Sequence, residues 1–102
     1  MLIILNKSPK SETSESILKI AEYLAKKGEN VAVLHIQDAS IAVEVKEYCD
    51  KLEKSKIHAY CLKADLEVRG RNQTSKNVKL IDYKQWVELL MNEHDKTVSW
   101  TS

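Results

Sequence analysis

Short apolar runs alternate along this chain with longer segments in which apolar residues recur every three or four positions. The short runs have the length and composition of strands that are buried on both faces. They are residues 2–5, 31–36, 57–62 and 78–81. The longer segments each have one apolar face, which is typical of amphipathic helices. They are residues 14–27, 41–52, 63–69 and 83–93.

This order predicts an α/β fold with a mainly parallel sheet. Strands that are separated by helices cannot be hairpin neighbours, so consecutive strands should run in the same direction. Right-handed crossovers then give a small three-layer, flavodoxin-like sandwich of four or five strands with helices on both faces. No repeat, linker or low-complexity segment interrupts the pattern, and we expect a single domain over residues 1–102.

Single residues mark where the predicted helices begin and end. Gly28 follows the first helical segment and Gly70 follows Arg69 in the third, and glycine suits the left-handed conformation that often ends a helix. Asp82 is expected to cap the fourth helix, because its carboxylate accepts hydrogen bonds from free N–H groups. The apolar face predicted for that helix consists of Trp86, Val87, Leu90 and Met91.

Composition excludes several classes of protein. Hydrophobic residues make up 43% and charged residues 30% of the chain, a balance typical of soluble globular proteins, and the net charge is +1. Direct binding to nucleic acid or to an anionic membrane is therefore not expected. The apolar run at the amino terminus is too short for a signal peptide or a membrane span, which favours a cytoplasmic protein with free thiols. With two glycines and no CxxC or Cys/His pattern, no cofactor and no metal site are expected.

Cys61 is the residue with the clearest chemical interest. In open parallel sheets, functional groups gather at the carboxyl ends of the strands, and Cys61 lies at that end of the strand predicted over 57–62. A helix is predicted to begin directly after it, so free N–H groups and Lys63 would favour a thiolate. The alternative is a buried core residue, because cysteine behaves as a small hydrophobe.

Other candidate residues have simpler expected roles. Cys49 lies on the apolar face of the second helix and is expected in the core. His35 and His58 lie in predicted strands, where a buried and hydrogen-bonded imidazole is the default, whereas His94 is expected to be solvated. A local basic rim, or simply a solvated set of charges, is expected at the carboxyl edge of the sheet from Lys7, Lys10, Lys63, Arg69 and Arg71.

Gln37, Asp38 and Trp100 are the candidate interface residues. Gln37 and Asp38 follow the second predicted strand, where they either cap the next helix or make a polar contact at a subunit edge. Trp100 is the one large apolar residue of a polar tail. It packs either on a partner or on its own domain, and tryptophan is enriched at interfaces.

Five short motifs, taken in order, resemble the TusB/DsrH family of small sulfur-relay subunits. They are NKSP (6–9), QDA (37–39), DLEVRG (65–70), LIDYKQWVEL (80–89) and VSW (98–100). The resemblance covers essentially the whole chain. It implies a DsrE-like fold and assembly with TusC/DsrF-like and TusD/DsrE-like subunits, typically as a heterohexamer. It also implies a role in passing persulfide sulfur between proteins, toward 2-thiolation of the tRNA wobble uridine in the Tus branch or sulfur oxidation in the Dsr branch.

Two positions differ from the family pattern. Some DsrH-type members have a cysteine in the first helix where this chain has Ile17, which cannot hold a persulfide. The common TusB-type pattern has an apolar residue at Cys61, although sister TusD/DsrE subunits place their active cysteine in a similar position, shortly before an Arg-Gly pair. The resemblance therefore favours an assembly role over a carrier role at Cys61, and a non-enzymatic subunit over an independent enzyme. The alternative is a stand-alone, homo-oligomeric α/β module that binds a small ligand.

Overall fold

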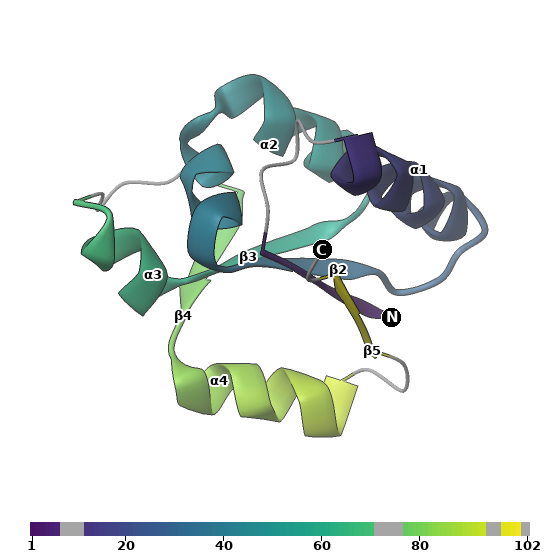
Figure 1. Cartoon of the computed structure of the whole chain (residues 1–102). Helices are drawn as coiled ribbons and strands as arrows, with labels where there is room; N and C mark the ends of the chain where they lie inside the picture. The colour runs from purple at the N-terminus through teal and green to yellow at the C-terminus, as the bar shows by residue number, and fades with distance from the viewer. Residues whose placement is uncertain (7–11, 71–76, 94–96, 101–102) are drawn as a thin grey trace.

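Five parallel strands form the centre of the molecule (Figure 1). The computed structural model describes residues 1–6, 12–70, 77–93 and 97–100. The strands are β1 (Leu2–Leu5), β2 (Ala32–His35), β3 (His58–Leu62), β4 (Val78–Ile81) and β5 (Thr97–Trp100). Their order across the sheet is β4-β3-β2-β1-β5, so β5 lies beside β1, at the far side of the sheet from β4. The predicted parallel α/β sandwich is confirmed.

Helical segments cover both faces of the sheet. They are α1 (Glu12–Lys26), the 3₁₀ helix η1 (Gln37–Glu44), α2 (Lys46–Lys54), α3 (Lys63–Val68), α4 (Tyr83–Glu88) and the π-helical turn η2 (Leu89–Glu93). Figure 1 shows α1 and α2 over one face and α4 over the other. The connections from β1 to β2, β2 to β3 and β3 to β4 all run in one direction across the sheet, whereas the connection from β4 to β5 runs in the opposite direction. Because these connections are right-handed, the first three lie on one face of the sheet and the last lies on the other.

Alternation along the strands creates a core on each face. In β1, Ile3 and Leu5 belong to the larger core, together with Leu18, Val43, Leu52 and Leu66 from α1, η1, α2 and α3. Leu2 and Ile4 point to the smaller core beneath α4. Because both sets of side chains are buried, the strands read as continuous apolar runs in the sequence.

The second predicted helix differs from the structure. Residues Gln37–Glu44 form a 3₁₀ helix, Val45 is extended with φ −85° and ψ 105°, and α2 begins only at Lys46. Ser40 and Val43 are both fully buried, and residues three apart lie on the same side of a 3₁₀ helix. Packing of this side against the sheet explains why the segment is a 3₁₀ helix. The spacing of apolar residues in the sequence did not separate this segment from α2, so one helix was predicted to begin at residue 41.

Helix α4 begins as predicted but turns a different face to the sheet. Asp82 accepts a hydrogen bond from the Gln85 backbone N–H at 2.8 Å, and the Gln85 side chain accepts one from the Asp82 N–H at 3.0 Å, so the pair forms a capping box. Trp86 and Leu89 pack into the smaller core, whereas Val87, Leu90 and Met91 are exposed. The predicted apolar face is therefore wrong for these three residues. The helix has apolar residues on two sides, and the side with Trp86 and Leu89 is the one that packs on the sheet.

Within the described part of the chain, every helix is too short or too polar to cross a membrane.

Candidate functional site at the carboxyl ends of the strands

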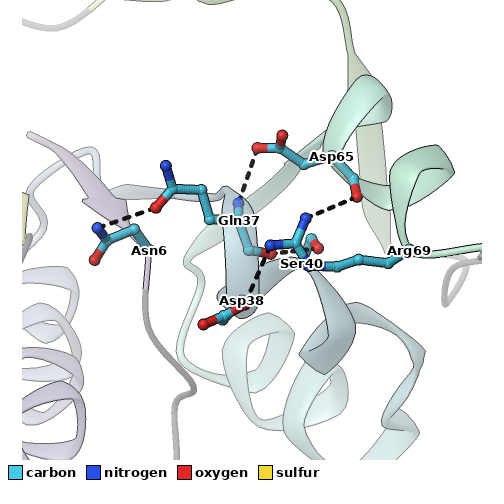
Figure 2. Close-up of polar contacts among 6 residues, drawn as sticks. All are labelled: Asn6, Gln37, Asp38, Ser40, Asp65 and Arg69. Carbon is cyan, nitrogen blue, oxygen red and sulfur yellow. Dashed lines mark hydrogen bonds and ion pairs between the residues drawn. The ribbon is translucent and has the colours of Figure 1, made fainter.

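Polar side chains from three segments meet at the carboxyl ends of β1 and β2 (Figure 2). Asn6 follows β1 and donates its side-chain amide to Gln37 Oε1 at 3.3 Å. The Gln37 backbone N–H in turn donates to Asp65 Oδ2 on α3, at 2.8 Å. Gln37 has φ 49°, in the left-handed region, and this turn directs its N–H toward α3. The contacts connect β1, η1 and α3 at the edge where parallel sheets place function.

Arg69 makes two contacts in this cluster. Its Nη2 lies 3.1 Å from Asp38 Oδ1, and its Nη1 donates to the Asp65 backbone carbonyl at 3.1 Å. The Ser40 hydroxyl donates to the Gln37 carbonyl at 2.6 Å and closes the first turn of η1. One guanidinium thus ties the end of α3 to the start of η1, a link between residues 31 positions apart that sequence spacing did not reveal.

The capping role predicted as the simpler alternative for Gln37 and Asp38 is wrong. Ile36 is the residue before η1, and no side chain caps it. Gln37 and Asp38 lie inside the helical segment, with both side chains exposed. Asp38 binds Arg69 instead, because the left-handed turn at Gln37 brings the start of η1 beside the end of α3.

Cys61 lies at the predicted end of β3, but its side chain is in the core. It is 0% exposed and belongs to the larger core together with Cys49 and Leu66. Its thiol is free, and its nearest hydrogen-bond acceptor is the Leu62 carbonyl at 3.8 Å. The connection that follows β3 crosses one face of the sheet, and the connection that follows β4 crosses the other. Cys61, at the end of β3, therefore borders the point where the winding direction changes. Its position fits a working thiol, whereas its burial fits a core residue.

The environment of Cys61 disfavours the thiolate. Burial, and to a smaller extent the Asp65 carboxylate, raise the pKa of Cys61 to about 12, although the nearby Arg69 guanidinium acts to lower it. The expected lowering of this pKa by the helix start is therefore wrong, because desolvation exceeds the effect of the helix dipole. Lys63 pairs with Glu67 at 3.9 Å. A carrier role for Cys61 stays a prediction.

His35 forms a buried contact that the sequence did not reveal. Its Nδ1 lies 2.8 Å from the Tyr60 carbonyl and its Nε2 lies 2.6 Å from the Tyr48 hydroxyl. A carbonyl only accepts, so Nδ1 carries the proton and Nε2 accepts from Tyr48. Burial lowers the pKa of His35 to about 4, so this imidazole is neutral at pH 7. His35 and Cys61 are register partners on β2 and β3, which places both on the same face.

The remaining candidate residues have mixed outcomes. Cys49 is buried as predicted, and the prediction of a buried imidazole is confirmed for His35. For His58 it is wrong, because this side chain is exposed at the start of β3. His94 and three members of the basic rim, Lys7, Lys10 and Arg71, lie outside the described residues.

The Trp100 backbone ends β5 in register with Leu5, and its side chain lies outside what the structure describes. Among the described residues, no group of three or more His, Cys, Asp or Glu side chains is placed to hold a metal ion.

Comparison with known proteins identifies the family. The family model described as DsrH like protein matches residues 7–97. This chain belongs to the DsrH-like family. The DsrH-like chain is 32% identical over 102 residues to Protein TusB of Pectobacterium parmentieri, a match that covers 98% of this chain and 100% of the relative. The TusB/DsrH resemblance stated from the motifs is thereby confirmed.

The fold of this DsrH-like chain also has a solved counterpart. The crystal structure of the ychN protein from E. coli superposes with a TM-score of 0.82, covering 97% of each chain at 16% identity. At that identity the likeness establishes the fold alone. It agrees with the expected DsrE-like sandwich.

The Arg69 contacts yield a stability prediction for the DsrH-like chain. Replacing Arg69 with alanine is expected to lower the free energy of unfolding by about 1–2 kcal/mol, because one charge-assisted hydrogen bond and one ion pair are lost from a side chain that is 25% exposed. Asp38→Ala should cost less, about 0.5 kcal/mol, since its carboxylate is 78% exposed. Urea denaturation measures both. Lys63→Ala, which breaks an exposed pair with Glu67, is the control, and an equal loss in all three variants would contradict the prediction.

Proposed function

We propose that this chain is a subunit of a sulfur-relay complex, that it serves the assembly of that complex, and that a partner subunit carries the reactive cysteine. Membership of the DsrH-like family supports the relay. The name of the TusB relative belongs to the Tus branch, which supports a pathway toward 2-thiolation of the tRNA wobble uridine. The single observation that carries the assembly role is the burial of Cys61, which is 0% exposed with a pKa of about 12.

A relay thiol needs access to an incoming persulfide and needs thiolate character. Its sulfur attacks the outer sulfur of the donor, as a thiolate attacks a disulfide. Cys61 meets neither condition in this conformation, and Cys49 is also buried. Ile17, at the position where some relatives have a cysteine, is half-buried and packs against the larger core. These three positions together favour a chain that holds a carrier subunit in place.

The carboxyl edge of the sheet is the surface proposed for TusC/DsrF-like and TusD/DsrE-like partners. Gln37 and Asp38 expose their side chains there, on a turn that Asp65 and Arg69 hold by hydrogen bonds. Trp100 ends β5 at the same edge and is the candidate anchor for a partner. A turn held in this way offers a preorganised polar surface, because little ordering is left to occur on binding.

The proposal is tested on the complex itself. A tagged chain is isolated from its source cells and incubated with a cysteine desulfurase and cysteine, and the intact mass of every chain in the eluate is measured. We expect partner subunits of similar size to co-elute, one partner to gain the mass of a sulfur atom, and this chain to gain none. The same experiment is run with Cys61→Ser and with Cys49→Ser.

Two outcomes would overturn the proposal in different ways. A sulfur adduct on this chain that is absent only from Cys61→Ser would make it a carrier in its own right. Elution of the chain without any partner subunit would favour the stand-alone ligand-binding module.

A further inference from the structure

A groove lies between α1 and α2, toward the ends of the two helices. Its volume is about 640 Å³, within the range of sites for small ligands, and the small side chain of Ala25 contributes to its lining. The two helices lie side by side here, joined by an ion pair of Lys51 with Glu22 at 3.4 Å (Figure 1). Both belong to connections that return over the sheet between parallel strands, so they end near the amino ends of the strands. The groove is therefore remote from the carboxyl edge with Gln37 and Asp38.

Four lysines from three segments line this groove. Lys26 ends α1, Lys51 and Lys54 belong to the last turn of α2, and Lys56 lies in the short connection to β3. All four are exposed, and of the four only Lys51 forms an ion pair with a described residue. The whole chain has a net charge of only +1, so the groove is a local concentration of positive charge.

Stabilisation of the helix ends accounts for only part of this arrangement. A lysine in the last turn interacts favourably with the helix dipole, which explains Lys26 and Lys54 one helix at a time. It does not explain Lys56, which lies beyond α2 and has φ 60°, a left-handed conformation that is strained for a residue with a Cβ. Strained backbone is enriched at positions that hold ligands. Like charges that share one groove also repel each other until an anion binds.

Two carboxylates in the same groove restrict the kind of anion that fits. Glu47 lies one helical turn before Lys51 on α2, and Asp50 lies one turn before Lys54. The lysines therefore gather toward the end of the helix and the carboxylates toward its start. A carboxylate repels a simple polyanion, but it accepts hydrogen bonds from hydroxyl groups such as those of a ribose.

From this polarity we infer that the groove binds a free nucleoside polyphosphate, with its phosphates against the lysines and its ribose hydroxyls against Glu47 and Asp50. Ammonium groups bind phosphate oxygens as point charges, so such a site does not require the glycine-rich loop that this chain lacks. Exposed lysines lose side-chain entropy on binding, and the expected affinity is therefore modest. The site is separate from the partner surface proposed at Gln37, Asp38 and Trp100, so the two proposals fail separately.

Isothermal titration calorimetry of the purified chain with ATP, in low salt and without divalent cations, tests the groove. Wild type is expected to bind ATP saturably, and added salt should weaken binding because ions screen the lysines. Lys54→Glu reverses one charge in the groove and should raise the dissociation constant at least about tenfold. Lys46→Glu makes the same change at an exposed position of α2 that does not line the groove. This matched control should leave the dissociation constant within about threefold of wild type.

A comparison of ATP with tripolyphosphate tests the role of the carboxylates. The double variant Glu47→Ala/Asp50→Ala removes two negative charges, so it should bind tripolyphosphate more tightly than wild type does. It also removes the acceptors for the ribose, so the preference for ATP over tripolyphosphate, measured as the ratio of the two dissociation constants, should fall about tenfold. Circular dichroism confirms that each variant is folded.

Three results would overturn the inference. They are the absence of saturable ATP binding to wild type, an equal loss of affinity in Lys54→Glu and Lys46→Glu, and an unchanged preference for ATP in the double variant. None of them depends on whether partner subunits co-elute with the chain.

Discussion

Lowering the pH from 7 to 4.5 is expected to reduce the free energy of unfolding by about 2–3 kcal/mol through His35 alone. The imidazole is fully buried, and each of its nitrogens already has one partner. A second proton would bring a charge into the core and would direct an N–H at the oxygen of Tyr48, whose hydroxyl hydrogen now points at Nε2. Both effects oppose protonation in the folded state.

The direction of the effect follows from the two pKa values. His35 has a pKa of about 4 when folded, against 6.5 in the unfolded chain. The unfolded state therefore binds a proton as the pH falls below 6.5, while the folded state remains neutral until the pH approaches 4. The contribution of neutral His35 is fully present above pH 6.5 and is lost between 6.5 and 4. A difference of this size corresponds to about 3 kcal/mol in full.

Urea denaturation at a series of pH values separates His35 from the carboxylates that titrate in the same range. His35→Gln cannot take up the proton, so its stability should fall less between pH 6.5 and 4.5 than that of wild type, although it is less stable at pH 7. His58→Gln changes an exposed histidine and should follow the wild-type profile. An identical slope in wild type and His35→Gln would show that His35 does not control this pH dependence.

Thiol labelling of the native protein is expected to be at least about a hundredfold slower at Cys61 than in the unfolded chain. Raising the pKa from 9.0 to about 12 lowers the thiolate fraction near neutral pH about a thousandfold. The greater nucleophilicity of a more basic thiolate offsets a small part of this, and burial of the side chain within the larger core adds steric protection.

The measurement uses Cys49→Ser, so that Cys61 is the one remaining thiol of the chain. Reaction with an aromatic disulfide is followed in native buffer and in concentrated urea. Cys61→Ser gives the matching rate for Cys49, which is also buried and lies 3.4 Å from the Val43 carbonyl. Labelling of native Cys61 within tenfold of the unfolded rate would contradict the burial and would favour the carrier role over the assembly role.

Much of the architecture was predictable because it depends on local features. β1 and β4 were predicted to the residue, since apolar runs of this length between polar segments favour strands buried on both faces. The capping role of Asp82 and the left-handed turns at Gly28 and Gly70 follow from the chemistry of single residues, and the structure confirms them. Parallel pairing followed from the alternation of strands with helices.

The candidate site was less predictable because its residues meet only after folding. Arg69 and Asp38 are far apart in sequence, and nothing in their neighbours indicated the ion pair. The Tyr48 contact to His35 joins a helix to a strand in the same way. A carboxylate or hydroxyl near a strand end has many possible partners, and the sheet order that selects one of them was not predicted.

Local chemistry in the sequence by itself determined four of the five strands, most helix ends, the parallel sheet and, through its motifs, the DsrH-like family, whereas β5 lies in what was predicted as a polar tail. The tertiary structure decided which surfaces and groups are available for chemistry. It buried Cys61, turned Trp86 rather than Met91 toward the core, and paired Arg69 with Asp38. The physical reason is that exposure and pKa depend on the surroundings of a side chain in space, which come from segments that are distant along the chain.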